Sequence, residues 1–125
     1  MAIGQTKGKL LIVDDENAIL KAYVRALSTN YEVETASTLE TAIAMIDRTS
    51  YDSILTDLQL TESGEEGYQI IKYARKKFPK ASIILNSSAC LGDVEKIALE
   101  SGASHVLRKP VLLKELKQKL AVKCQ

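Results

Sequence analysis

Acidic side chains follow two apolar segments of the sequence. The apolar run at 10–13 leads directly into Asp14, Asp15 and Glu16. A second segment, "SILTD", ends in Asp57. Carboxylates that share a site repel one another, since two unit charges about 4 Å apart cost about 4 kcal/mol at an effective dielectric constant of about 20. If the two segments lie side by side, their acids therefore need a bound cation or a shared proton.

Two further apolar segments end in polar side chains of other kinds. "ASIILNSS" ends in Ser87 and Ser88, and "SHVLRK" ends in Lys109. A cluster of oxygen ligands without histidine or cysteine favours a hard cation, Mg²⁺ before Ca²⁺. A lysine and a hydroxyl beside such a cation suit the transfer of a phosphoryl group to a carboxylate nucleophile. Asp57 is the best candidate acceptor, because its strand comes between the first-strand acids and Lys109.

Short β-type runs alternate with longer helical patterns along the chain. We expect strands at residues 9–13, 31–36, 51–57, 81–88 and 104–109. Helical patterns follow them at about 16–28, 38–48, up to 77, 91–101 and after Pro110. Strands separated by helices of this length are parallel and joined by right-handed crossovers. The sequence therefore predicts an α/β fold, a (βα)5 doubly wound open parallel sheet of the flavodoxin-like order 2-1-3-4-5.

This strand order brings the acids together. Ligands bind to such sheets beyond the carboxyl ends of the strands, at the point where the strand order reverses. In the order 2-1-3-4-5 that point lies between the first and third strands, which end in Asp14-Asp15 and in Asp57. The segment "YEVETA" at 31–36 agrees with this order, because its alternation is typical of a half-exposed strand at a sheet edge.

Local patterns predict where some helices begin and which residues they bury. "STLE" is typical of a capping box, with Ser37 as the N-cap and Glu40 reaching back to it. Gly102 is expected to end the fourth helix. The apolar stripes of the last two helices include Ile97 and Leu113, which we therefore expect to face the core.

The composition predicts one globular domain. The chain has 125 residues and a net charge of +1, so bulk electrostatics give no reason to expect direct nucleic-acid binding. We expect a flexible arm at 1–8 and a single domain at 9–123.

Cys90 and Cys124 have no metal-binding spacing and are interpreted as reduced thiols. No apolar run approaches the roughly 20 residues of a membrane span, and no signal peptide is evident, so we expect a cytoplasmic protein.

The sequence resembles the receiver domain of two-component response regulators, of the chemotaxis type. The resemblance covers most of the chain. Its motifs are "IVDDE" at 12–16, "LTDLQL" at 55–60, Ser87 after an apolar strand, and the pair Lys109-Pro110. The intervals of 30 residues from Asp57 to Ser87 and of 22 from Ser87 to Lys109 are also similar.

The resemblance implies a role for each of these residues. Asp57 would accept a phosphoryl group from the phosphohistidine of a sensor histidine kinase or phosphotransfer protein, or from a small phosphodonor. Ser87 and Lys109 would engage the phosphoryl oxygens, and the peptide before Pro110 is usually cis in the family. The Mg²⁺ ligands would be Asp14, Asp15, Asp57 and the backbone carbonyl of Gln59. Phosphorylation would then shift a two-state equilibrium that an output domain or partner protein recognises in a phosphorelay.

The sequence also departs from the family pattern. Thr61 stands where the family often has proline, and the glycine expected eight residues after the phosphoacceptor appears ten residues after it, at Gly67. The loop beside the site is therefore two residues longer. Ser88 stands where the family has a smaller residue, commonly alanine. The larger side chain slightly narrows access to the site. Val106 occupies the position where the family usually has an aromatic switch residue. The coupling in which the hydroxyl and the aromatic ring both turn inward therefore cannot operate in its usual form.

Other functions fit parts of the pattern. A degenerate receiver would bind partners without being phosphorylated. A phosphatase of the haloacid-dehalogenase type would need a second aspartate where this chain has Gln59, so we expect no turnover of an external substrate and only slow autodephosphorylation. A flavin or nucleotide binder would need a phosphate-binding loop where this chain has "DDEN". One of Asp14 and Asp15 could also simply cap the helix that follows.

Overall fold

The computed structural model describes residues 7–62, 64–88 and 92–121. Within this part of the chain, strands and helices alternate, and all strand pairs are parallel. The strand order is β2-β1-β3-β4-β5, which confirms the predicted doubly wound sheet. Cys90, Cys124 and most of the expected N-terminal arm lie outside the described residues. No helix in the described ranges has the length and apolar character needed to span a membrane.

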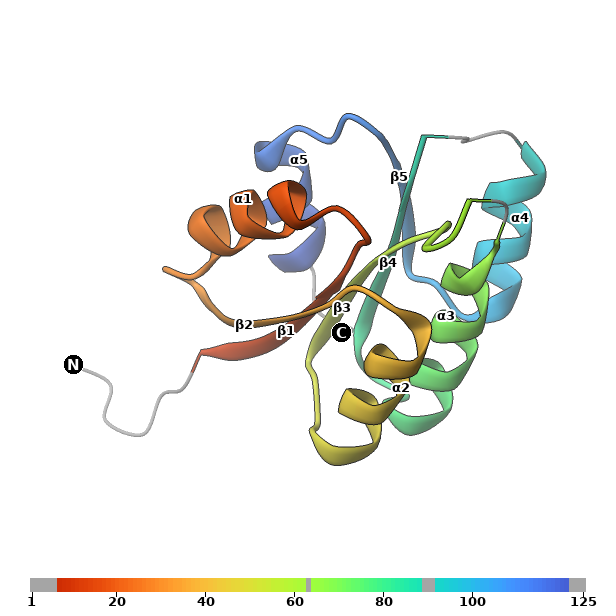
Figure 1. Cartoon of the computed structure of the whole chain (residues 1–125), viewed down its shortest axis with the longest axis horizontal. Coiled ribbons are helices and arrows are strands. Elements are labelled where there is room, and N and C mark those ends of the chain that lie inside the picture. Colours follow the sequence, from red (N-terminus) through yellow and green to blue (C-terminus); the bar gives the residue numbers. More distant parts are fainter. Residues whose placement is uncertain (1–6, 63, 89–91, 122–125) are drawn as a thin grey trace.

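The elements agree with the predicted ones to within a few residues. The strands are β1 (Gly8–Val13), β2 (Tyr31–Ala36), β3 (Ser53–Asp57), β4 (Ser82–Ser87) and β5 (His105–Arg108). The helices are α1 (Asn17–Leu27), α2 (Leu39–Arg48), α3 (Glu66–Lys77), α4 (Gly92–Ser101) and α5 (Leu113–Ala121). Helices α1 and α5 cover one face of the sheet, and α2, α3 and α4 cover the other (Figure 1).

Alternation along the central strands divides the core into two layers. Leu10 and Ile12 of β1 belong to the cluster beneath α1 and α5, whereas Leu11 and Val13 belong to the cluster beneath α2, α3 and α4. All four side chains are at most 1% exposed. Since each fully buried leucine, isoleucine or valine contributes about 1.5–3 kcal/mol, these layers fix the position and register of β1 within the sheet.

The N-cap predicted for α2 was wrong. Thr38, not Ser37, precedes the first helical residue, and its side-chain hydroxyl accepts a hydrogen bond from the backbone N–H of Thr41 at 3.1 Å. A side chain caps a helix only from the residue directly before it, where it can reach the N–H three residues on. Because the helix starts one residue later than expected, the cap moves from Ser37 to Thr38.

Two residues predicted to face the core are exposed. Ile97 is 41% exposed, because α4 approaches the sheet through its neighbour Ala98, which is fully buried. Leu113 is 43% exposed, although Leu116 and Leu120 of the same stripe are fully buried. Leu113 is the first residue of α5, and it lines a surface pocket instead of the core.

Gly102 ends α4 as predicted and is held by an arginine of α3. Its φ of 120° lies in the region that favours glycine, and a Cβ there would lie 2.8 Å from the Cγ of Arg75. Arg75 donates hydrogen bonds to the carbonyl oxygens of Gly102, Pro79 and Ala81 at 2.8–2.9 Å. The last turns of α3 are therefore tied to the connections that lead into β4 and β5.

Gly67, at the start of α3, packs directly on the end of β3. Its N–H donates to the carbonyl oxygen of Leu58 at 2.8 Å. A Cβ at this position would lie 2.5 Å from the carbonyl oxygen of Asp57 and 2.7 Å from the Cα of Leu58. Since both neighbours are backbone atoms, they cannot move aside without moving the strand end, and the sequence therefore needs glycine here.

We expect Gly67→Ala to destabilise the protein by about 1–3 kcal/mol, because the added methyl group overpacks the junction of α3 with β3. Urea denaturation of both proteins measures the difference. Gly92→Ala is the matched control, since a Cβ at Gly92 meets nothing within 4 Å. Equal stability of Gly67→Ala and wild type would contradict the close approach described here.

Candidate functional site

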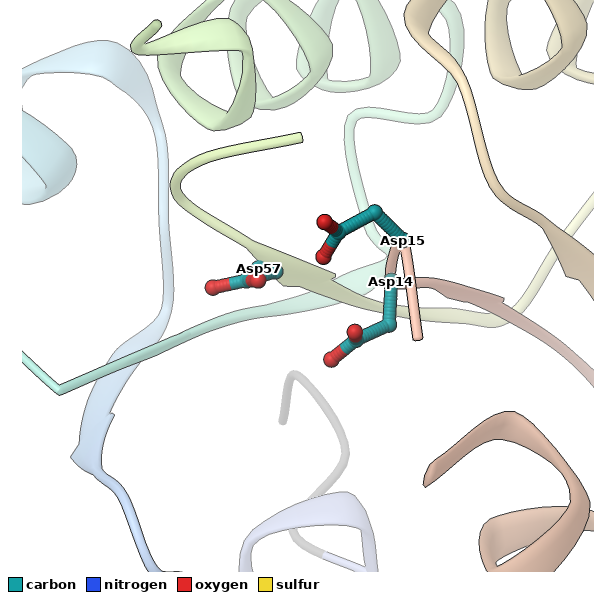
Figure 2. Close-up of side chains that lie close together, drawn as sticks. All are labelled: Asp14, Asp15 and Asp57. Carbon is teal, nitrogen blue, oxygen red and sulfur yellow. The ribbon is translucent and has the colours of Figure 1, made fainter. Parts of the chain in front are cut away.

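Three carboxylates meet where the strand order reverses. The register pairs Val13 with Thr56, so the residues that follow, Asp14 and Asp57, lie on neighbouring strand ends. Asp14, Asp15 and Asp57 each offer a carboxylate oxygen, and these oxygens lie within 4.8 Å of one another. Figure 2 shows the three side chains gathered beyond the ends of β1 and β3. The structure thus brings together the acids that the sequence predicted.

Each acid is held differently. Asp14 is 2% exposed, and its Oδ1 accepts a hydrogen bond from the N–H of Glu16 at 3.0 Å. Asp57 is half-buried, and its Oδ1 accepts from the N–H of Leu58 at 2.8 Å. Asp15 is exposed. Helix α1 begins after Glu16, and the side chain of Glu16 makes no capping hydrogen bond. The hydrogen bond that Asp14 accepts comes from the N–H of Glu16, before the first helical residue. The capping interpretation therefore does not explain Asp14.

Lys109, which directly follows β5, brings a positive charge to the cluster. Its Nζ lies 3.2 Å from Oδ2 of Asp57 and 3.3 Å from Oδ2 of Asp14. The backbone N–H of Lys109 donates to the carbonyl oxygen of Ser87 at 2.9 Å, which fixes the position of this residue beside the end of β4. The peptide bond between Lys109 and Pro110 is cis. The ammonium group therefore bridges two of the three acids.

Burial and neighbouring charges both shift the pKa values of the cluster. Burial raises the pKa of Asp57 above its ordinary value, and the nearby carboxylate of Asp14 adds to this effect, while Lys109 only partly opposes it. Burial alone would lower the pKa of Lys109, but the charges of Asp57 and Asp14 outweigh it and raise that pKa. The ionised form of Asp57 is therefore less favourable here than in water.

The other residues predicted for the site lie around this cluster or farther along the strands. Ser87 is buried at the end of β4, one residue beyond the partner of Asp57 in the sheet. Ser88 and Gln59 are exposed in the loops that follow β4 and β3. Val106 is partly buried and packs against the core beneath α2, α3 and α4. Ser87 is thus the last residue of β4, and Gln59 lies two residues after the end of β3. Val106 lies in the adjoining core.

Sequence reasoning missed a partly buried polar pair beside Lys109. The side-chain amide Nδ2 of Asn86 donates to the hydroxyl of Tyr23 at 3.0 Å, and Asn86 is 2% exposed. Tyr23 and Lys109 both line a pocket of about 550 Å³ between α1 and the start of α5. Burial raises the pKa of Tyr23, so its hydroxyl stays protonated. An asparagine inside the apolar run "SIILNS" was the sequence signal that could have revealed this pair.

In metal-free buffer we expect Asp57→Asn to raise Tm by a few degrees at pH 7. The pKa of Asp57 is raised in the folded state, so its ionisation opposes folding. This penalty is absent below the ordinary pKa of 3.8 and grows as the pH rises through the raised value. Thermal unfolding of both proteins in chelator, from pH 4 to pH 7, measures it. A Tm difference that stayed constant over this range would argue against a raised pKa of Asp57 in the folded protein.

A family model matches nearly the whole chain. The model described as "Response regulator receiver domain" matches residues 10–121. Among curated proteins, the alginate biosynthesis transcriptional regulatory protein AlgB of Pseudomonas aeruginosa is 31% identical over 107 residues. This match covers 85% of the chain but only 23% of the relative, so the chain spans about a quarter of the length of that protein.

Solved structures share the fold over most of their length. A CheY-like response regulator receiver domain protein from Methanospirillum hungatei JF-1 is 28% identical, with a TM-score of 0.82 and coverage of 92% of this chain and 94% of the other. The receiver domain of a sensor histidine kinase from Pseudomonas aeruginosa PAO1, solved with a magnesium ion coordinated in its active site cleft, is 25% identical. Its TM-score is 0.75, with 92% and 95% coverage. With this fold, this acid cluster and the family match, the chain belongs to the response regulator receiver domains of two-component systems.

Proposed function

We propose that Asp57 is the phosphoacceptor of a signalling switch. The observation that carries this proposal is the bridge from Lys109 to Oδ2 of Asp57 and Oδ2 of Asp14 inside a cluster of carboxylates. An ammonium group already within 3.2 Å of the acceptor oxygen can remain beside it while charge develops on the phosphoryl group. The phosphodonor is the phosphohistidine of a sensor histidine kinase or phosphotransfer protein.

The transfer step needs one nucleophile and two groups that bind the phosphoryl oxygens. A carboxylate oxygen of Asp57 forms a bond to phosphorus, and the phosphorus–nitrogen bond to the donor imidazole breaks, leaving its electron pair on the nitrogen. Lys109 and the hydroxyl of Ser87, from the ends of β5 and β4, contact the phosphoryl oxygens. Gln59 provides no carboxylate for a general base, so we expect slow autodephosphorylation and no turnover of an external substrate.

The acid cluster fits Mg²⁺. Its carboxylate oxygens lie within 4.8 Å of one another, so one small cation can contact all three acids, and its ligands are the hard oxygens that Mg²⁺ prefers. We propose that Asp14, Asp15, Asp57 and the backbone carbonyl of Gln59 hold the ion. When bound, Mg²⁺ neutralises charge on the phosphoryl group. The magnesium ion in the related receiver domain from Pseudomonas aeruginosa PAO1 supports this assignment.

The output is proposed to pass through protein contacts. The relative AlgB is named a transcriptional regulatory protein, so an output domain or partner protein that acts on transcription is one candidate for the next step. This domain, with its net charge of +1, is not proposed to bind nucleic acid itself. We propose a cytoplasmic location, where the chain would meet the phosphodonor.

A second candidate function is a receiver that binds partners without phosphorylation. Val106 favours it, since this aliphatic side chain packs against the core at the position where the resemblance implies an aromatic switch. In that case the acid cluster would remain, but no covalent change at Asp57 would control the partner surface.

An acyl phosphate with Mg²⁺ should add one phosphoryl group to the wild-type chain and none to Asp57→Asn, because the variant lacks the nucleophilic oxygen. Intact-mass spectrometry of both proteins distinguishes the two candidate functions. A wild type that stayed unmodified under these conditions would favour the receiver that acts without phosphorylation.

Mg²⁺ should raise Tm of the wild type, because the ion relieves the repulsion in the folded state. At a concentration about 100 times Kd, binding stabilises the fold by about 2.7 kcal/mol. Asp15→Asn should reduce this gain, since it removes one exposed ligand. Thermal unfolding in Mg²⁺, in chelator and in NaCl of equal ionic strength separates binding from screening. The metal assignment fails if Asp15→Asn keeps the full gain.

A further inference from the structure

The loop between β3 and α3 is folded around the carboxylate of Glu66. Oε1 of Glu66 accepts a hydrogen bond from the N–H of Leu60 at 3.0 Å. Oε2 accepts one from the hydroxyl of Thr61 at 2.5 Å. The hydrogen bond from Thr61 is the main reason that the pKa of Glu66 lies below its ordinary value. A single side chain at the first position of α3 thus holds two consecutive residues of the loop.

Gly64 closes the loop over this carboxylate. Its N–H donates to the carbonyl oxygen of Thr61 at 3.3 Å. A Cβ at Gly64 would touch both carboxylate oxygens of Glu66 and the hydroxyl of Thr61. The backbone can therefore pass this close to Glu66 only without a side chain. Leu60, Thr61 and Gly64 of the longer loop thus all lie against this carboxylate.

The start of α3 also holds the backbone of Leu58, the residue before Gln59. Gly67, the residue after Glu66, donates to the carbonyl oxygen of Leu58 at 2.8 Å. Leu58 and Leu60 are 4% and 7% exposed, whereas Gln59 between them is exposed. Both neighbours of Gln59 are therefore buried and hydrogen-bonded to consecutive residues of α3, which leaves the backbone around Gln59 little freedom.

We propose that Glu66 is the positioning residue of the metal-binding loop, holding the backbone so that the carbonyl of Gln59 faces the ion. The inference rests on the proposed Mg²⁺ site. Mg²⁺ demands nearly ideal octahedral geometry, so a ligand on a loosened loop binds it poorly. Groups that orient metal ligands without touching the metal change metal affinity by roughly 10–100-fold when they are removed.

Isothermal titration calorimetry of the full chain with Mg²⁺ tests this role. We expect Glu66→Ala to raise Kd roughly tenfold. Glu66→Gln should stay closer to the wild type, because its side-chain oxygen can still accept from the N–H of Leu60. Glu65→Ala is the matched control, since it removes the same charge from the adjacent residue, whose side chain makes no capping hydrogen bond. Gly64→Ala should weaken binding as Glu66→Ala does, because its methyl group displaces the carboxylate.

The rate of phosphorylation by an acyl phosphate gives a second measure. If Glu66 only positions the loop, the Mg²⁺ concentration for half-maximal rate rises in Glu66→Ala while the rate at saturating Mg²⁺ equals that of the wild type. Equal Mg²⁺ affinity in Glu66→Ala and wild type overturns the inference and leaves the site intact. An equal loss in Glu65→Ala assigns the effect to charge and also overturns it. A wild type that binds no Mg²⁺ overturns the proposed metal site itself, and this inference with it.

Discussion

Repulsion among the carboxylates of Asp14, Asp15 and Asp57 is the constraint on which the rest of the structure depends. A flexible chain would separate these charges. Here β1 and β3 are paired and buried on both faces, so the free energy of burying their apolar side chains keeps the acids together. Lys109 offsets part of the repulsion, while burial keeps the pKa of Asp57 above its ordinary value. The fold thereby maintains a site that is ready to accept positive charge.

The groups around the cluster come from several elements at the carboxyl edge of the sheet. The backbone of Lys109 is bonded to the end of β4, and the pair of Asn86 and Tyr23 links β4 to α1 beside the same lysine. On the other side, the first residues of α3 hold the loop that follows Asp57. Separate elements thus fix the lysine and the loop, so each can be altered without dismantling the acid cluster.

Features set by the alternation of apolar residues could be predicted from the sequence, and those set by the exact path of a loop could not. Asp14 and Asp57 follow buried runs, and in a parallel sheet strand ends must meet at one edge. Thr38, by contrast, caps α2 because the helix starts one residue later than the "STLE" pattern implies. The hydrogen bond from Thr61 to Glu66 depends on the exact path of the loop, and no periodic pattern encodes such a contact.

Helix α3 is anchored at both ends, and this has a mechanical consequence. Its first turn bonds the loop beside Asp57, and Arg75 near its last turn bonds the carbonyl oxygen of Gly102, which precedes β5. A helix of 12 residues is about 18 Å long and behaves as a stiff rod over that length. A shift of the loop that carries α3 with it therefore pulls on the segment before β5 through the hydrogen bonds of Arg75. This connection runs through backbone and guanidinium groups, and it does not require an aromatic ring at Val106.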